Sequence, residues 1–200
     1  MFVGPWPSLD RAAAFGAVGR GFKSPRARFT DCGWVWVVSV SSVGGRVALG
    51  GTFALIHRGH IRLFDEAARL GAPVTVGVTV NPLIRKYHEI PSFEERCERV
   101  RSFFTSTYDV PVEVVGLRDH YGPVASDPGY THLVTSEESL AYSCELSKVR
   151  VGRGMGALNI VLVETVRAFD GRPVSTTRIL GGEIDLEGRP TCEVRRDYSW

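Results

Sequence analysis

Residues 46–60 of this 200-residue chain read RVALGGTFALIHRGH, and this stretch decides the fold. It begins with a short apolar run, Val47-Ala48-Leu49, that ends at a glycine pair, which is typical of a buried strand followed by a tight loop. Beyond it, apolar residues recur at helical spacing from Ile61 to Leu70, before a glycine and a proline end the predicted helix. Residues 74–79, VTVGVT, predict the next strand. The stretch therefore predicts a strand–helix–strand unit of a parallel sheet.

The same alternation continues to the end of the chain. Ser92 and Glu95 form a capping box that predicts a helix running to about Thr107. Further strands are predicted at residues 112–115, 132–135 and 159–164, and further helices at residues 139–149 and 175–180. Alternating strands and helices indicate an α/β protein with a parallel sheet. Because such sheets bind ligands at the carboxyl ends of their strands, the loops that follow the strands are expected to surround one crevice.

Composition places few limits on function. The net charge of +2, with 44% hydrophobic and 23% charged residues, is ordinary for a globular protein and does not require nucleic acid or an anionic membrane as a partner. No apolar run approaches the roughly 18 to 20 residues that span a bilayer. The cysteines are Cys32, Cys97, Cys144 and Cys192. Because they contain no CxxC pair, they favour a reducing, cytoplasmic setting over a structural zinc site or a dense disulfide framework.

The two ends of the chain differ from the middle. Residues 1–45 are rich in Gly, Ala and Arg, have Asp10 and Asp31 as their acids, and show no sustained period. They fit a disordered basic tail, a targeting leader or an upstream extension. A secretory signal is disfavoured because the apolar run starts only at Trp34, so a poorly ordered extension is the preferred interpretation. The folded domain is predicted at 46–186, with a C-terminal tail at residues 187–200.

Chemistry concentrates in the loop after the first strand. His57 and His60 are three residues apart at the start of the predicted helix, where they share a face. The N–H groups and dipole at a helix start favour anions, and imidazoles can donate to phosphate oxygens. Gly51 lets the backbone approach a ligand, and Thr52 adds a hydroxyl. Either histidine alone could be surface or core filler, whereas the whole pattern indicates phosphate binding; zinc is disfavoured because no third ligand is evident.

These residues also carry a resemblance. Gly51-Thr52-Phe53 followed by His57-Arg58-Gly59-His60 resembles the GTFDxxHxGH signature of the HxGH nucleotidyltransferase superfamily. Its members are Rossmann-like enzymes that transfer a nucleotide monophosphate from a nucleoside triphosphate to a phosphorylated acceptor. Residues 174–179, VSTTRI, are similar to the superfamily's second mark, ISSTxI. The resemblance implies a three-layer α/β/α domain with a parallel sheet.

The middle of the chain narrows the resemblance to one family. Residues 119–123 read DHYGP, residues 126–128 read SDP and residues 134–139 read VTSEES. This progression resembles the pantetheine-phosphate adenylyltransferases of archaeal and eukaryotic type, and residues 92–96, SFEER, match that group's helix start. The resemblance covers about Arg46 to Ile184. It implies transfer of adenylyl from ATP to 4′-phosphopantetheine, giving dephospho-coenzyme A and pyrophosphate. The sequence leaves the oligomeric state open, with a monomer favoured, and neither nucleic acid nor a membrane is expected as a partner.

The resemblance also implies roles for individual residues. The catalytic residues are His57, His60 and Lys86, with His60 nearest the α-phosphate. The implied ATP-binding residues are Gly51, Thr52, Phe53, His57, His60, Ser136, Arg150, Ser175, Thr176, Thr177 and Arg178. The implied acceptor-binding residues are Thr52, Lys86 and Tyr121. Because the acceptor phosphate is already ionised, no general base is needed, and Mg²⁺ is expected to bridge ATP phosphates without a metal site built by the protein.

Two positions depart from the pattern, and they keep alternatives open. Ala54 stands where the superfamily has aspartate, and Ser147 stands where the group has asparagine. The first change permits a catalytically silent nucleotide-binding module. A sibling cytidylyltransferase or FMN adenylyltransferase is a second alternative, although residues 170–177, DGRPVSTT, lack the RTxG of the cytidylyltransferase form. Nucleic-acid binding through the N-terminal segment is a third, disfavoured because its charges are scattered.

Overall fold

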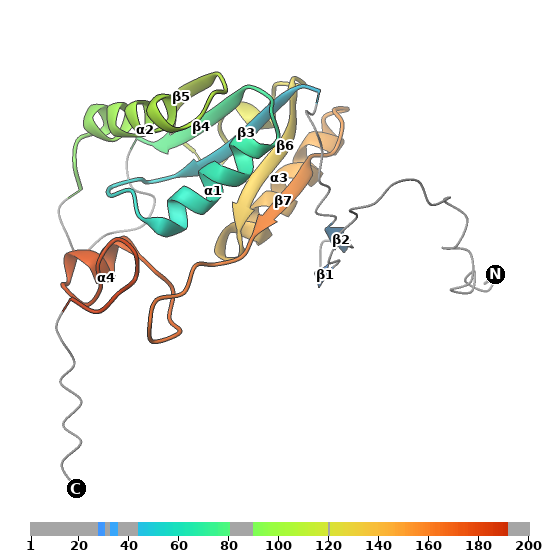
Figure 1. The fold of residues 1–200 in the computed structure, drawn as a ribbon. Coiled ribbons are helices and arrows are strands. Elements are labelled where there is room, and N and C mark those ends of the chain that lie inside the picture. Colours follow the sequence, from blue (N-terminus) through green and yellow to red (C-terminus); the bar gives the residue numbers. More distant parts are fainter. Residues whose placement is uncertain (1–27, 31–32, 36–43, 81–89, 120, 192–200) are drawn as a thin grey trace, which may run out of the picture.

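The computed structural model describes residues 28–30, 33–35, 44–80, 90–119 and 121–191. Its centre is a five-stranded sheet in the order β5-β4-β3-β6-β7, and every neighbouring pair is parallel (Figure 1). The strands are β3 (Arg46–Gly51), β4 (Val74–Thr79), β5 (Val112–Leu117), β6 (Tyr130–Ser136) and β7 (Asn159–Val163). The α/β class and the strands predicted from the sequence are confirmed.

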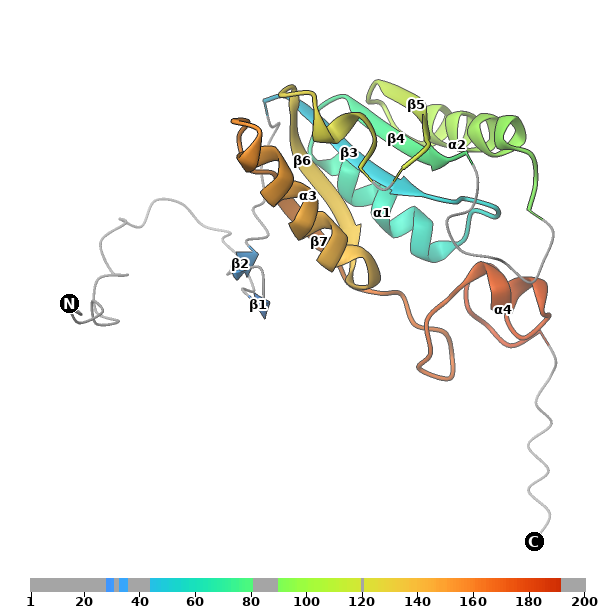
Figure 2. The ribbon, with the colours of Figure 1, turned by 180° about the vertical axis from the view of Figure 1, so that it is seen from behind.

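Helices cover both faces of this sheet. They are α1 (Arg58–Arg69), α2 (Phe93–Thr107) and α3 (Leu140–Gly152), with short 3₁₀ turns η2 (Gly122–Ala125) and η3 (Glu137–Ser139). The short helix α4 (Thr176–Leu180) lies beyond the end of the sheet (Figure 1). Figures 1 and 2 show α1 and α2 on one face and α3 on the other. The predicted Rossmann-like three-layer α/β/α arrangement is therefore confirmed.

The order of the strands locates the crevice. From β3 the chain moves outward through β4 to β5, and it then returns to the other side of β3 to form β6 and β7. The loops that follow β3 and β6 consequently diverge to opposite faces of the sheet, which leaves a gap at their carboxyl ends. Gly51 ends β3 and Ser136 ends β6, so both residues lie at this switch point.

The α1–α2 face holds the larger core. Burial is complete or nearly so along β4, whose six residues are all buried, as expected for a central parallel strand. Phe64 of α1 and Phe104 of α2 are both 0% exposed and pack with their rings 5.6 Å apart. The predicted capping box is confirmed, since the Ser92 hydroxyl accepts from the Glu95 N–H and the Glu95 carboxylate accepts from the Ser92 N–H.

The opposite face holds a smaller apolar cluster under α3 and η2. Its buried members are Ala48, Val124, Ala125, Tyr130, Leu133, Leu146 and Leu158. Tyr130 is 2% exposed, and its hydroxyl donates to the Thr75 hydroxyl at 3.2 Å. Because the cluster is small, it leaves room for a cavity at the carboxyl end of the strands.

Both chain ends add structure that the sequence pattern does not predict. Within the predicted extension at residues 1–45, β1 (Arg28–Thr30) and β2 (Gly33–Val35) pair antiparallel, with Phe29 opposite Trp34. Such three-residue strands are too short to show a period of two. Residues 1–27, 31–32 and 36–43 lie outside the described part of the chain.

The C-terminal segment folds back onto the start of α1. The Arg58 N–H donates to the Leu186 carbonyl at 3.1 Å, and the Arg58 guanidinium forms an ion pair with Glu187. The Asp185 carboxylate accepts from the N–H groups of Glu187 and Arg189, which closes a turn. The first part of the predicted tail, residues 187–191, therefore continues the fold; residues 192–200 lie outside the described part of the chain.

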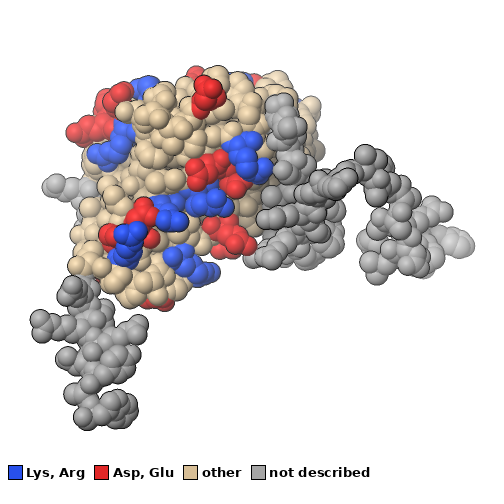
Figure 3. Space-filling model, in the orientation of Figure 1, with Lys and Arg blue, Asp and Glu red and all other residues tan. Residues whose placement is uncertain are grey.

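The surface is mixed in charge. On the face drawn in Figure 3, basic and acidic side chains are intermingled. Glu66 of α1 pairs with both Arg62 and Arg69, and Arg101 of α2 pairs with Glu98. Exposed pairs of this kind contribute little to stability. No helix among the described residues is long and apolar enough to cross a membrane.

Candidate active site

A polar cavity of about 360 Å³ lies at the carboxyl ends of β3 and β7. One wall is formed by Gly51 and Thr52, together with both histidines of the α1 start. The facing wall includes Ser175, Thr176 and Thr177. The structure thus brings together the two sequence motifs that are more than a hundred residues apart, and it lines the space between them with hydroxyl and imidazole groups.

His57 is held in one orientation and one charge state. It is the N-cap of α1, and its Nδ1 accepts a hydrogen bond from the Gly59 N–H at 3.2 Å. The side chain is 6% exposed, and this burial lowers its pKa from 6.5 to about 4. At neutral pH the ring is therefore uncharged, and because Nδ1 is the acceptor, the single ring proton sits on Nε2. His57 accordingly offers one N–H donor.

His60 stacks against this ring. The ring centroids of His57 and His60 are 3.9 Å apart with an interplanar angle of 25°. Gly59 makes the arrangement possible, since a Cβ at that position would lie 3.1 Å from the His57 Cε1. Two stacked imidazolium cations would repel each other, and the neutral state of His57 avoids this repulsion.

Phe53 packs its ring against His60. Its backbone is in the left-handed region, with φ of +51°, which is uncommon for a bulky residue and stores strain of the order of 1–3 kcal/mol. This turn sends the ring into the core, where it is 1% exposed and 4.9 Å from the His60 ring. The ring does not line the polar cavity, and the ATP-binding role implied for Phe53 stays a prediction.

A second cavity of about 220 Å³ lies on the α3 side of the sheet and is mainly apolar. Tyr121 lines this apolar cavity, and its hydroxyl donates to the Glu145 carboxylate at 2.8 Å. The Asp119 carboxylate accepts from the N–H groups of Tyr121 and Gly122, which fixes the turn of the DHYGP stretch. Five residues line both cavities: Gly50, Gly51, Leu63, Ser136 and Ser139. The two spaces therefore adjoin at the switch point.

Thr52 stands at this junction. Its side chain receives a hydrogen bond from the hydroxyl of Thr79, with the two oxygens 3.3 Å apart. Thr52 lines the polar cavity and Thr79 lines the apolar cavity. The two hydroxyls therefore lie where the polar and the apolar cavity meet.

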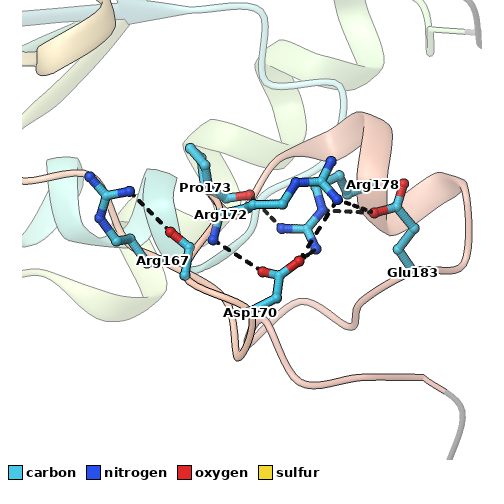
Figure 4. A network of polar contacts seen from close by, with 7 residues as sticks. Arg167, Asp170, Arg172, Pro173, Arg178 and Glu183 are labelled. Atoms are coloured by element: carbon cyan, nitrogen blue, oxygen red, sulfur yellow. Dashed lines mark hydrogen bonds and ion pairs between the residues drawn. The ribbon is translucent and has the colours of Figure 1, made fainter. Parts of the chain in front are cut away.

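Arg178, for which the resemblance implies a contact with ATP phosphates, is held by carboxylates in the structure. Its guanidinium lies buried between two of them, with Nη2 2.6 Å from Asp170 and Nε 2.9 Å from Glu183 (Figure 4). Nη1 donates to the Pro173 carbonyl at 3.0 Å. These contacts raise the pKa of Arg178, first through its hydrogen bond with Glu183. Arg178 braces the segment that presents the three hydroxyls and does not itself line the polar cavity. Its binding of ATP stays a prediction.

Arg150, for which the resemblance also implies ATP binding, is buried away from the polar cavity. Its side chain is 1% exposed and donates to main-chain carbonyls, among them those of Asp127 at 2.8 Å and Tyr130 at 3.0 Å. Tyr130 begins β6, so these contacts lie at the amino edge of the sheet, away from the carboxyl ends where the polar cavity opens. A matching motif position shows that an arginine is present but not which way its side chain points.

Two other positions complete the comparison with the sequence. Lys86 lies in residues 81–89, outside the described part of the chain, so its catalytic role stays a prediction. Arg96, which in the sequence marks only a helix start, donates to the Thr52 carbonyl at 2.8 Å. The signal was available: Arg96 lies on the same helical face as Val100 and Phe104, both 0% exposed, and a charged residue on a buried face needs partners.

Comparisons with known proteins agree with this geometry. Residues 48–181 match the family model described as Cytidylyltransferase-like. A phosphopantetheine adenylyltransferase from Methanosarcina acetivorans is 34% identical over 149 residues, which cover 72% of this chain and 94% of that protein. One from Methanothermobacter thermautotrophicus is 36% identical over 150 residues, covering 74% and 91%. A crystal structure of a protein of unknown function from Archaeoglobus fulgidus has a TM-score of 0.54 and 32% identity, over 59% of this chain and 88% of that one.

Proposed function

This chain belongs to the cytidylyltransferase-like family and, within it, to the phosphopantetheine adenylyltransferases, and on that basis we propose that it transfers adenylyl from ATP to 4′-phosphopantetheine. The products are dephospho-coenzyme A and pyrophosphate. One observation carries the assignment of the site: a polar cavity lined by both histidines and three hydroxyls adjoins an apolar cavity at Gly50 and Gly51. A nucleotidyl transfer between two phosphorylated substrates needs such a pair of sites.

The two cavities suit the two substrates. The polar cavity, with its hydroxyl and imidazole donors, suits the triphosphate of ATP. The apolar cavity is lined by aliphatic side chains such as Val115, Leu117 and Leu146 and suits the gem-dimethyl and methylene groups of the pantetheine arm. Tyr121 and Thr75 in the same lining offer hydroxyls for the amide groups of that arm. The acceptor phosphate would then lie nearest Thr52.

The chemical step needs positioning and charge stabilisation. An oxygen of the acceptor phosphate forms a bond to the α-phosphorus of ATP while the bond from that phosphorus to the bridging oxygen of pyrophosphate breaks. The attacking oxygen is already ionised, so no base is required. The Nε2–H of His57 and the ring of His60 are placed to stabilise the charge that builds on the phosphate oxygens, in the manner of preorganised donors.

The departing pyrophosphate faces the hydroxyls of Ser175, Thr176 and Thr177. Their segment is fixed by the salt bridges of Arg178 to Asp170 and Glu183 (Figure 4). In this proposal the hydroxyls bind the β- and γ-phosphates, and Arg178 acts through the segment it braces.

In this proposal Mg²⁺ enters the site bound to the phosphates of ATP and neutralises part of their charge. Phosphate oxygens are the hard ligands that this ion prefers. Glu138 and Glu164 are the carboxylates that line the polar cavity and would complete its shell. Among the described residues no group of three or more His, Cys, Asp or Glu side chains is gathered around a common point, so phosphate oxygens and water would supply the remaining ligands.

Pyrophosphate release tests the proposed function. The protein is incubated with ATP or CTP and with 4′-phosphopantetheine, glycerol 3-phosphate, phosphoethanolamine or FMN. We expect release with ATP and 4′-phosphopantetheine. Release with CTP and glycerol 3-phosphate or phosphoethanolamine, or with ATP and FMN, would establish a sibling enzyme instead. Nucleotide binding without release for every pair would establish the silent module that Ala54 permits.

A further inference from the structure

Arg96 is a buried cation that the proposed chemistry does not use. Its side chain is 2% exposed, and burial lowers its pKa. Its described hydrogen bonds go to main-chain carbonyls: Nη1 to Thr52 and to Thr79 at 2.8 Å each, Nη2 to Val80 at 3.2 Å, and Nε to Pro91 at 3.0 Å. A buried guanidinium is costly unless its N–H groups are satisfied, and here carbonyls from separate segments satisfy them.

The carbonyls come from the part of the fold where the two cavities meet. Thr52 follows β3, Thr79 ends β4, and Pro91 precedes α2. One nitrogen, Nη1, holds the carbonyls of both Thr52 and Thr79, whose hydroxyls touch each other at the junction of the cavities. By holding these two carbonyls, a single guanidinium fixes the backbone positions from which the two hydroxyls extend.

We propose that Arg96 is a positioning residue for adenylyl transfer, which it serves by holding the carbonyls of Thr52 and Thr79 so that the Thr52 hydroxyl faces the attacking phosphate. This inference rests on the proposed function. A lysine cannot replace it, because a single ammonium lacks the planar fork that reaches three chain segments at once. The phosphate never needs to touch Arg96.

The alternative is that Arg96 only stabilises the fold, and the chain offers a matched control. Arg46 begins β3, the strand whose opposite end leads into Thr52. Its guanidinium forms an ion pair with Asp127 and lies 4.1 Å from the centroid of the Tyr130 ring. Because Arg46 lines neither cavity, we expect its loss to weaken the fold without moving Thr52.

The test compares Arg96→Lys and Arg96→Gln with Arg46→Lys and Arg46→Gln. Steady-state kinetics are measured for both substrates, alongside circular dichroism and thermal unfolding of each variant. For the Arg96 variants we expect a loss of kcat on the order of 10²-fold, because misplacing a positioning group by about 1 Å has that effect. The KM for 4′-phosphopantetheine should rise as well, while the KM for ATP stays within about threefold of wild type. The Arg46 variants should unfold at lower temperature with kcat within about twofold.

Every outcome decides the matter. Folded Arg96 variants with normal kcat, or with equal increases in both KM values, would overturn the inference. Arg96→Lys and Arg96→Gln that both fail to fold while the Arg46 variants fold would show an ordinary structural anchor and overturn it too. Failure of the proposed function is distinguishable, since the wild-type protein would then release no pyrophosphate from ATP and 4′-phosphopantetheine, and the inference would fall with it.

Discussion

Arg96 on α2 and Arg150 on α3 are both buried and have the same kind of hydrogen-bond partner, but they lie at opposite edges of the sheet. Arg96 is 2% exposed and Arg150 is 1% exposed, and both donate to main-chain carbonyls from several segments. The carbonyls that Arg96 holds lie at the carboxyl ends of β3 and β4, beside both cavities. Those that Arg150 holds lie around the start of β6, at the opposite edge of the sheet.

The difference shows that the role of a buried arginine depends on the edge of the parallel sheet at which it lies. Loops at the carboxyl edge bind ligands, whereas those at the amino edge connect elements. Substituting a buried arginine should therefore change the kinetic constants when the arginine acts at the carboxyl edge, and the free energy of unfolding when it acts at the amino edge. Substitutions at each edge can separate these two effects.

The largest expected effect is at the carboxyl edge, in His60→Ala. Removing one preorganised donor to the transition state should lower kcat on the order of 10²- to 10³-fold, while thermal unfolding changes little. His132→Ala is the matched control, since His132 lies near the start of β6, opposite Val47 in the sheet register. It should leave kcat unchanged. Normal adenylyl transfer by folded His60→Ala would remove His60 from the site.

At the amino edge, Arg150→Met should act on stability. Several buried carbonyls lose a charged donor, so we expect the free energy of unfolding to fall by about 2–4 kcal/mol, measured by denaturant titration. The KM for ATP should stay near the wild-type value at a temperature where the variant is folded. A rise in that KM of tenfold or more, roughly 1.4 kcal/mol, would restore the ATP-binding role implied by resemblance and break the comparison of the two edges.

The pH dependence of stability sharpens the view of the carboxyl edge. Burial lowers the pKa of His57 from 6.5 to about 4, so the unfolded chain takes up a proton as pH falls below about 6.5 while the folded chain does not. Stability is therefore full above pH 6.5 and is lost progressively down to about pH 4, by at most about 3 kcal/mol for a shift of this size. His57→Asn should flatten this part of the curve.

A control isolates that effect. Burial also lowers the pKa of His132, which acts in the same direction. Stability of the wild type, His57→Asn and His132→Gln is measured by denaturant titration from pH 7.5 to pH 4.5. We expect His57→Asn to remove the larger part of the slope. An unchanged slope in His57→Asn would show that the ring is not buried in the neutral state.

Much of this architecture is readable from the sequence because it depends on local pattern. The alternation of strands and helices, the capping box at Ser92 and the meeting of the His57 and Ser175 motifs all follow from period, capping chemistry and strand order. What the sequence hid were side-chain directions. Arg178 has carboxylate partners five residues ahead of it and eight behind, and Arg96 reaches carbonyls up to 44 residues away. The buried face of α2 indicates that Arg96 needs partners, but no local pattern identifies the carbonyls or carboxylates that these arginines reach, because those contacts form only when the segments pack.

The smallest expected effect concerns Arg178, and it asks whether this arginine behaves like Arg96. If Arg178 acts by bracing the hydroxyls of Ser175 to Thr177, then Asp170→Asn should cause the same kind of defect as Arg178→Lys, a rise in the KM for ATP of about tenfold or less. The double variant should be no worse than Arg178→Lys alone, because the same ion pair is lost in each case.

Arg172→Lys is the control for this comparison. Arg172 pairs with the same two carboxylates from the exposed side, at 3.8 Å from Asp170 and 3.5 Å from Glu183 (Figure 4). Its substitution should change the KM for ATP little. If the increases in the KM for ATP add in the double variant, Arg178 contacts the phosphates directly. Its ion pairs with Asp170 and Glu183 would then belong to the unliganded site alone.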